Sequence, residues 1–186
     1  GNELVGTIVG PYEITHLIGR GGSSVVYSAQ HREIGLRVAI KFLRPDLATH
    51  AVQIAHEARA LSRQSHPSLV KIFALEQLPD GRPYIIMEYL EGISLRTMIR
   101  DSGSSFPVKL VCQIVGQIAS TMSALHAAGI IHRDISPNNV MLVPDSDVPG
   151  GHRVKIFDFG IAQFHADRRD PWFDENTFTD KTSSTV

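Results

Sequence analysis

The sequence is nearly free of cysteine. Among its 186 residues only Cys112 carries a thiol, so no disulfide can form within the chain. Nothing in the sequence therefore favours a secreted scaffold held together by disulfides. A reducing compartment is the simpler environment for such a chain, and we expect the protein to be cytoplasmic.

Charge of one sign is not in excess either. The 18 Lys and Arg residues nearly balance the 19 Asp and Glu residues, which leaves a formal net charge of −1. Domains that bind nucleic acid or anionic membranes through a broad surface are usually basic, so we expect no nucleic-acid partner. Hydrophobic residues make up 42% of the chain and charged residues 20%, a balance that excludes a disordered tail and a collagen-like chain.

The sequence has no stretch that is typical of a targeting signal or a membrane span. Its first four residues lack the basic region and apolar run of a signal peptide. The most apolar stretch, residues 108–131, is interrupted by polar side chains such as Lys109, Gln113 and Gln117. A span needs about 20 nearly uncharged apolar residues, so we expect no membrane segment within this chain. Its length suits one compact unit, or one unit with an extension.

The first 90 residues favour β-strands with one helix between them. Alternating and β-branched runs predict five strands, at residues 12–18, 25–29, 37–43, 70–75 and 84–89. In the third strand, Ala39 and Lys41 share one face because side chains alternate with a period of two. The opposite face carries Val38, Ile40 and Phe42.

A helical pattern follows at residues 49–64. Ile54, Ala58 and Leu61 recur at spacings of four and three residues, and Glu57 falls on the same inward stripe. Because an acid within an apolar stripe needs a cation, we expect a basic partner for Glu57.

From Gly92 onward the pattern is mainly helical. Pro107 suits a first helical position and Gly129 suits a C-terminal cap, so we expect a long helix between them. After this helix we expect a loop at residues 132–139 and short strands at residues 140–143 and 154–157.

A glycine cluster, formed by Gly19, Gly21 and Gly22, lies between the first two expected strands. In dinucleotide-binding folds such a cluster lies between a strand and a helix, whereas here a strand follows, which predicts a hairpin. Two interpretations remain at this point. The cluster is either a simple glycine-rich turn or a loop whose backbone N–H groups approach phosphate oxygens because side chains are absent.

Polar side chains recur downstream of this cluster in a fixed order. Lys41 follows Gly19 by 22 residues, and Glu57 follows Lys41 by 16. The expected loop then places Asp134 and Asn139 five residues apart, and Asp158 follows Asp134 by 24 residues. One Asp in a loop is usually a turn or cap residue. Two Asp and one Asn, in this order after a lysine and a glycine loop, are hard to assign to turns.

In this order the motifs resemble those of eukaryotic-type (Hanks-type) protein kinases, and of bacterial serine/threonine kinases in particular, over residues 12–162. The resemblance implies an α+β, two-lobed fold, with an antiparallel five-stranded sheet and one main helix in the N-lobe and a partial, mainly helical C-lobe. A change of composition at residues 90–92 marks the expected boundary between an N-lobe at 1–90 and a partial C-lobe at 91–186. The resemblance also implies transfer of the γ-phosphoryl group of ATP to serine and threonine hydroxyls of proteins, with Mg²⁺ as the metal and with autophosphorylation of the activation segment.

The resemblance further assigns roles to single residues. Lys41 would hold the α- and β-phosphates and pair with Glu57, while Asp134 would accept the proton of the attacking hydroxyl. Asn139 and Asp158 would hold the Mg²⁺ ions. The rest of the nucleotide site would comprise Ile18, Gly19, Gly21, Gly22, Val26, Ala39, Met87, Met141 and the backbone of Glu88 and Leu90. The apolar spine that active kinases assemble would comprise Leu61, Ile72, His132 and Phe159.

The sequence departs from the family pattern in its catalytic loop, where Ser136 replaces the lysine that usually contacts the transferring phosphate. A charge pair at about 4 Å and an effective dielectric of about 20 is worth roughly 4 kcal/mol, or on the order of a thousandfold in rate if nothing compensates. The alternative function is therefore a pseudokinase, a scaffold that binds nucleotide without transferring phosphate. A small-molecule kinase of related fold is a third alternative, which the motifs at residues 38–41 and 132–134 disfavour.

The Ala-Pro-Glu motif that closes the activation segment in this family is absent. We therefore expect the C-terminal part of the domain to be missing and this chain alone to be inactive toward protein substrates. The long helix would then expose an apolar face, unless a partner or a second chain covers it. Arg133 beside Asp134 is typical of kinases that are switched by phosphorylation of this segment. The favoured acceptors are Thr182, Ser183, Ser184 and Thr185.

Overall fold

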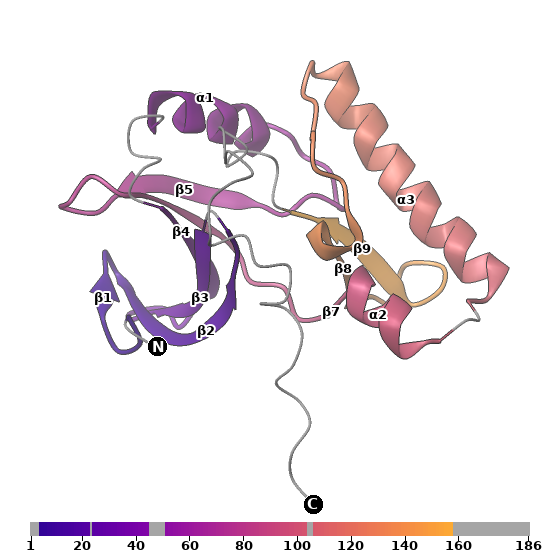
Figure 1. Cartoon of the computed structure of the whole chain (residues 1–186), viewed down its shortest axis with the longest axis horizontal. Coiled ribbons are helices and arrows are strands. Elements are labelled where there is room, and N and C mark those ends of the chain that lie inside the picture. The colour runs from indigo at the N-terminus through magenta and orange to yellow at the C-terminus, as the bar shows by residue number, and fades with distance from the viewer. Residues whose placement is uncertain (1–3, 23, 45–50, 104–105, 158–186) are drawn as a thin grey trace, which may run out of the picture.

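A computed structural model describes residues 4–22, 24–44, 51–103 and 106–157, except for the side chains of residues 51–53 and 57 (Figure 1). Its first part is a six-stranded antiparallel sheet in the order β1-β2-β3-β4-β6-β5. The strands are β1 (Ile8–Val9), β2 (Tyr12–Arg20), β3 (Ser24–His31), β4 (Arg37–Leu43), β5 (Ile72–Gln77) and β6 (Pro83–Glu88). One helix, α1 (Ala51–Ser62), lies between β4 and β5 in the chain.

The α+β class is confirmed, but the expected count of five strands in this sheet is wrong. The additional strand, β1, has only two residues, and it pairs with the start of β2 through Ile8 opposite Glu13 and Val9 opposite Tyr12. A two-residue strand is too short to produce an alternating pattern in the sequence, because such a pattern needs at least four residues. Its pairing partner therefore has to be seen in the folded chain.

The large sheet is curled (Figure 1), and one of its faces packs an apolar core. This core contains Val38, Ile40 and Phe42 of β4, which confirms the predicted face of that strand. The rings of Tyr27 and Tyr84 pack edge-on and tilted against Phe42, with centroid distances of 5.9 and 5.6 Å. Ala39 and Lys41 consequently face the other side of the sheet.

The second part of the chain combines two helices with a small sheet. Strands β7 (Ile93–Ser94), β8 (Val140–Pro144) and β9 (His152–Ile156) form a three-stranded antiparallel sheet in that order. Helix α2 (Leu95–Asp101) follows β7 directly, and the Ser94 side chain caps it by accepting a hydrogen bond from the Thr97 N–H at 3.0 Å. A short 3₁₀ helix (Pro137–Asn139) leads into β8.

The long helix α3 (Val108–Ala127) packs one face against the β8–β9 hairpin. Ile114 and Leu125 are buried on that face, whereas Val108, Val111 and Val115 on the outer face are 77%, 41% and 55% exposed.

By length and composition alone, α3 could cross a membrane. Its most apolar 18-residue stretch has a mean hydropathy of 1.3, and 17% of that stretch is buried. Core helices of folded domains often meet this criterion, so the helix is only a weak indication of a membrane span.

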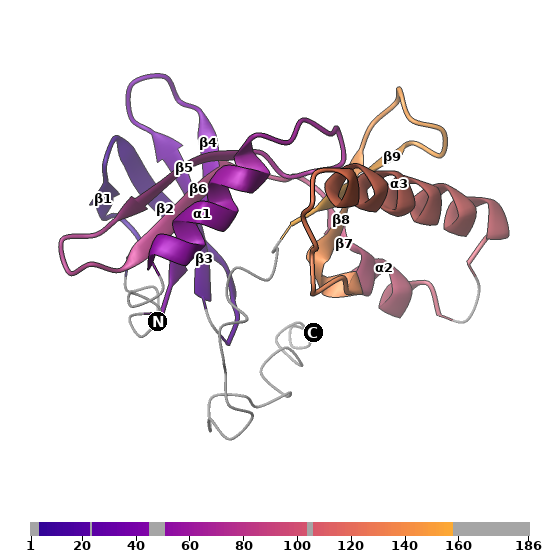
Figure 2. The ribbon, with the colours of Figure 1, turned by 90° about the horizontal axis from the view of Figure 1, so that it is seen from above.

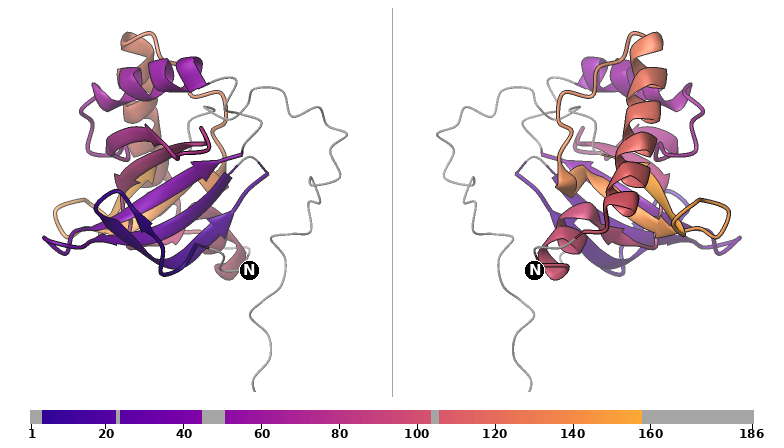
Figure 3. Two further views of the ribbon diagram at one scale, coloured as in Figure 1. Left: turned by 90° about the vertical axis from the view of Figure 1, so that its left-hand side faces the viewer. Right: turned by 90° about the vertical axis from the view of Figure 1, so that its right-hand side faces the viewer.

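The two parts are joined by a shared core and by backbone hydrogen bonds. Figure 2 shows α1 lying over the large sheet, with the second part beside it, and the end-on views of Figure 3 place α1 and α3 on the same side of that sheet. Ile54 of α1, Ile85 of β6 and Leu125 of α3 belong to one buried cluster. The Ile156 N–H donates to the Ser68 carbonyl at 2.8 Å, and the Val70 N–H donates to the Ile156 carbonyl at 3.1 Å.

Candidate active site

The glycine cluster forms the hairpin between β2 and β3, as the sequence predicts. Gly19 lies opposite Val26 in the β2–β3 register, and the Gly21 N–H donates to the Ser24 carbonyl at 2.8 Å. The Arg44 guanidinium, at the end of β4, donates to the Gly22 carbonyl at 3.3 Å. A strand on each side of the glycines excludes the strand–helix arrangement of dinucleotide-binding folds.

The second face of the large sheet brings together the residues predicted to contact a nucleotide. Lys41 lies opposite Val26 of β3, and Ala39 lies opposite Met87 of β6, so all four side chains share this face. Lys41 is 5% exposed and Ala39 is 7% exposed. Ile18, at a bulge in β2, is 48% exposed. A buried ammonium beside small and apolar side chains can bind the phosphates of a ligand whose ring packs on the apolar part.

The connection from β6 to β7 runs past the same face. The Glu88 N–H donates to the Lys71 carbonyl at 2.9 Å, so the Glu88 backbone could meet a purine only through its carbonyl oxygen. Leu90, whose backbone is the other predicted contact with the nucleotide, lies two residues further along the chain and is half-buried. Met141 of β8 is half-buried. Its neighbours Val140 and Leu142 lie on the opposite face of the strand and are buried in the cluster that includes Ile114 of α3.

The loop before β8 holds Asp134 and Asn139 together. The Asn139 amide nitrogen donates to the Asp134 backbone carbonyl and to its carboxylate Oδ2, both at 2.9 Å. Because both partners can only accept, the nitrogen must lie on this side of the amide, and the amide oxygen is left to bind a donor or a cation. Asn139 is 8% exposed. Its backbone carbonyl accepts a hydrogen bond from the Phe157 N–H at 3.1 Å, which ties the loop to the end of β9.

His132 anchors the same loop from inside the fold. Its Nδ1 accepts a hydrogen bond from the Asp134 N–H at 3.3 Å, and its Nε2 lies 3.3 Å from the Phe157 carbonyl. A carbonyl only accepts, so Nε2 carries the proton and the ring is the neutral Nε2–H tautomer. The ring is 2% exposed, and both nitrogens are engaged. His132 therefore orients the loop and is not available as a general base.

Arg133, next to His132, has a φ of 66° and is the one non-glycine residue with positive φ in the described part of the chain. This conformation costs a non-glycine residue free energy, and it persists only where surrounding contacts fix it. The engaged His132 ring and the Asp134–Asn139 contact lie on either side of Arg133. The contacts of His132 and Asn139 thus hold the turn, and with it Asp134, in place.

Several predicted site residues lie outside the described residues. They are Asp158 and Phe159, and the phosphorylation candidates Thr182, Ser183, Ser184 and Thr185. Glu57 lies in α1 on the stripe of Ile54, Ala58 and Leu61, which are buried, but its side chain is not described. Its ion pair with Lys41 therefore stays a prediction, as does the spine contact of Phe159. Leu61 and Ile72 do pack in the same core cluster.

No motif or spacing in the sequence points to the contacts of two polar residues that shape this region, Gln117 and Lys155. The Gln117 side chain donates to the His152 carbonyl at 3.1 Å and accepts from the Val154 N–H at 2.9 Å, so it completes the outer edge of β9. Lys155 is 8% exposed and binds the Glu88 carboxylate at 2.9 Å. The alternation of Arg153 and Lys155 with buried Val154 could have assigned their face, but not their partners.

The hairpin loop between β8 and β9 is fixed by a second ion pair. The Arg153 guanidinium donates to the Asp145 carboxylate at 2.5 Å. Two hydrogen bonds lower the pKa of the Asp145 carboxyl below its usual range. The larger effect comes from the Asp147 N–H and the smaller one from the Arg153 side chain. Among the described residues, no group of three or more His, Cys, Asp or Glu side chains could hold a metal ion.

Comparison with known proteins gives consistent matches. The family model for the protein kinase domain matches residues 12–181. Serine/threonine-protein kinase Pkn1 of Myxococcus xanthus is 38% identical over 166 residues, which cover 87% of this chain and 23% of the relative. The probable serine/threonine-protein kinase PknB of Corynebacterium glutamicum is 39% identical over 158 residues, which cover 82% and 23%. The chain thus spans about a quarter of the length of these curated relatives.

The same likeness is seen in three dimensions. The crystal structure of the Mycobacterium tuberculosis PknI kinase domain is similar with a TM-score of 0.71 and 28% sequence identity. The similarity covers 85% of this chain and 63% of the solved chain.

Proposed function

The chain belongs to the protein kinase domain family and has its two-lobed fold, and on this premise we propose that it transfers the γ-phosphoryl group of ATP to serine or threonine hydroxyls of proteins. The observation that carries the proposal is the Asp134 carboxylate, which the Asn139 amide holds at 2.9 Å in a loop with a strained turn. A carboxylate fixed in this way can accept a proton from a hydroxyl as it attacks. The named serine/threonine kinases among its relatives support the choice of acceptor.

Each residue of the proposed site has a defined task. Lys41 binds the α- and β-phosphates, and its burial strengthens the attraction because little water competes. The substrate hydroxyl oxygen forms a bond to the γ-phosphorus while the bond to the β–γ bridging oxygen breaks, and ADP leaves. Asp134 takes the hydroxyl proton in that step. Phosphoryl transfer depends mainly on this kind of positioning and on cancelling phosphate charge.

Protein kinases normally use Mg²⁺ with ATP, and the described residues fit such an ion. The amide orientation of Asn139 leaves its oxygen as a ligand, and hard oxygen donors are those that Mg²⁺ prefers. We propose that Asn139 and Asp158 hold the ion. When bound, Mg²⁺ would offset negative charge on the triphosphate.

Ser136 supports a second candidate function. It stands where a lysine usually contacts the transferring phosphate, and in this structure its carbonyl accepts a hydrogen bond from the Asn139 N–H at 3.0 Å. Losing that cation removes roughly 4 kcal/mol of attraction, so we expect a slower kinase. A nucleotide-binding scaffold without transfer is the alternative.

One experiment separates the two functions. The full-length protein is incubated with γ-labelled ATP, Mg²⁺ and a generic protein substrate, beside an Asp134→Ala variant, and ATP binding is measured in parallel. Label above the variant's level supports the kinase. ATP binding without such label identifies the scaffold, and absence of both would contradict the family-based proposal as a whole.

We also propose that further polypeptide covers the outer face of α3. The exposure of Val108, Val111 and Val115 supports this, since together they present an apolar stripe to water. Cys112 is exposed beside them and gives a direct probe, because a covered thiol reacts slowly with maleimide. Equal labelling rates for the isolated chain and the full-length protein would contradict the proposal.

We also propose that the protein acts in the cytoplasm. Its single cysteine, which is free, and its proposed use of ATP support this site of action.

A further inference from the structure

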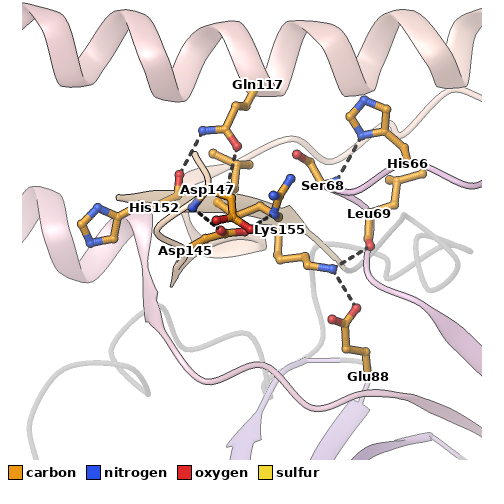
Figure 4. Close-up of polar contacts among 11 residues, drawn as sticks. His66, Ser68, Leu69, Glu88, Gln117, Asp145, Asp147, His152 and Lys155 are labelled. Carbon is orange, nitrogen blue, oxygen red and sulfur yellow. Dashed lines mark hydrogen bonds and ion pairs between the residues drawn. The ribbon is translucent and has the colours of Figure 1, made fainter. Parts of the chain in front are cut away.

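A buried ion pair links the β8–β9 hairpin to the connection between the two parts of the chain. Lys155 Nζ lies 2.9 Å from Glu88 Oε2 and 3.4 Å from the Leu69 carbonyl oxygen (Figure 4). The two charged side chains are 10% and 27% exposed. The Glu88 carboxylate also accepts a hydrogen bond from the Lys71 N–H at 3.2 Å. Neither the fold comparison nor the proposed chemistry assigns this cluster a task.

Its place in the hairpin directs Lys155 toward the proposed nucleotide site. Lys155 lies opposite Met141 in the β8–β9 register, and directly opposite residues of an antiparallel pair point to the same face. The other face of the hairpin, with Val154 and Ile156, is buried against α3. Lys155 therefore stands beside Met141, one of the residues predicted to line the nucleotide site.

The other residue of the ion pair, Glu88, belongs to the segment whose backbone is predicted to meet the edge of the purine. It is the last residue of β6, one position after Met87, and its carbonyl is the backbone group that can accept from a purine amine. One side-chain ion pair thus connects Lys155, the strand partner of Met141, with the residue whose backbone is predicted to meet the purine.

We propose that Lys155 is a positioning residue for the nucleotide: by holding the Glu88 carboxylate, it sets the place of the Glu88 carbonyl relative to Met141. This inference rests on the proposed nucleotide site. The Glu88 carboxylate accepts hydrogen bonds from Lys155 Nζ and from the Lys71 N–H. Without Lys155 it keeps the second of these and turns toward water, because a half-buried charge without a counter-ion is unfavourable. The backbone that carries the purine acceptor then loses its fixed place, and binding must restore it.

The chain offers a matched control on the same strand. Arg153 lies two residues before Lys155, so it shares the face, and it also forms an ion pair with a carboxylate. Its partner, Asp145, belongs to the hairpin loop and not to the connection at residues 88–92. Arg153→Met therefore removes a comparable ion pair from the same hairpin without touching Glu88.

The test compares two nucleotides that differ in one group. ATP carries a 6-amino group, which can donate a hydrogen bond to a carbonyl oxygen, and purine riboside triphosphate lacks it. Dissociation constants for both are measured by titration calorimetry on the full-length protein and its Lys155→Met, Lys155→Arg and Arg153→Met variants, with thermal melting as a check of folding. We expect Lys155→Met to weaken ATP binding about tenfold, which corresponds to about 1.4 kcal/mol, and to change purine riboside triphosphate binding less than twofold. Lys155→Arg should restore ATP binding to within about threefold, and Arg153→Met should leave both constants unchanged.

Several results would overturn the proposal. One is a folded Lys155→Met variant that binds ATP as the parent does, and another is an equal loss for both nucleotides, which would mark a general structural role. If Lys155→Met does not fold, Glu88→Gln replaces it, because that change removes the charge and keeps an oxygen for the Lys71 N–H. It should show the same selective loss, and no loss would again overturn the proposal. If the parent protein binds neither nucleotide, the proposed function itself fails, and this inference fails with it.

Discussion

Replacing Asn139 by aspartate separates the two tasks that its side chain can perform. The change keeps an oxygen on the side where a cation would bind. On the other side it replaces the amide nitrogen, which donates to the Asp134 carbonyl and carboxylate at 2.9 Å, by a second carboxylate oxygen. Cation binding is thus preserved while the contacts that position Asp134 are lost.

The distances set the size of the effect. A hydrogen bond to a charged group contributes about 1.5–3 kcal/mol and one to a neutral carbonyl about 0.5–1.5 kcal/mol. If both act in the transition state, their loss slows the reaction by roughly 30- to 2,000-fold. Two carboxylate charges at this separation repel by about 5–6 kcal/mol at an effective dielectric of 20. In Asn139→Asp this repulsion therefore replaces the hydrogen bonds that hold the Asp134 carboxylate in place.

The rate and its Mg²⁺ dependence give the decisive readout. Asn139→Asp keeps an oxygen for the cation but gives Asp134 no donor, so kcat should fall by the range given above while the Mg²⁺ dependence is retained. We measure kcat at saturating ATP over a series of Mg²⁺ concentrations with the full-length protein. Asn139→Ala is the control, because it loses both contacts and also the oxygen for the cation. The reasoning is refuted if kcat of Asn139→Asp stays within threefold of the parent, or if its Mg²⁺ dependence matches that of Asn139→Ala.

Gln117→Leu should lower the free energy of unfolding by about 2–4 kcal/mol, because it leaves a strand carbonyl and N–H without partners. Gln113→Leu, one helical turn earlier, should change it by less than about 1 kcal/mol, and equal losses in urea unfolding would contradict this. Gly92→Ala should destabilise by about 1–3 kcal/mol, since its new Cβ would meet the backbone of β8. Gly116→Ala, whose new Cβ would lie in open space on α3, should raise the free energy of unfolding by about 0.5–1 kcal/mol. The melting temperatures of the Gly92 and Gly116 variants should therefore shift in opposite directions, and shifts of the same sign would contradict this packing. Lys41→Met should slow phosphoryl transfer by on the order of a thousandfold, and an unchanged rate would remove Lys41 from the phosphate site.

Local patterns in the sequence were sufficient for most of the elements. The period of two placed Ala39 and Lys41 on one face of β4, and the period near 3.6 found α1, expected at 49–64 and observed as Ala51–Ser62. Both predictions depend only on how a backbone directs its own side chains. The fourth expected strand was less accurate: it was predicted at 70–75, whereas β5 is Ile72–Gln77. The reason is tertiary, since Ser68 and Val70 form backbone hydrogen bonds with Ile156 of β9.

The ordered set of the glycine cluster, Lys41, Glu57, Asp134, Asn139 and Asp158 determined which family the chain resembles, because this combination at these spacings is specific to that family. The hydrogen bonds that orient the Asn139 amide needed the folded loop, in which a 3₁₀ turn brings residue 139 back onto residue 134. Only the tertiary structure paired Lys155 with Glu88, 67 residues apart. Such a pair depends on the register of one hairpin and on how two lobes pack, and neither leaves a periodic signal in the sequence.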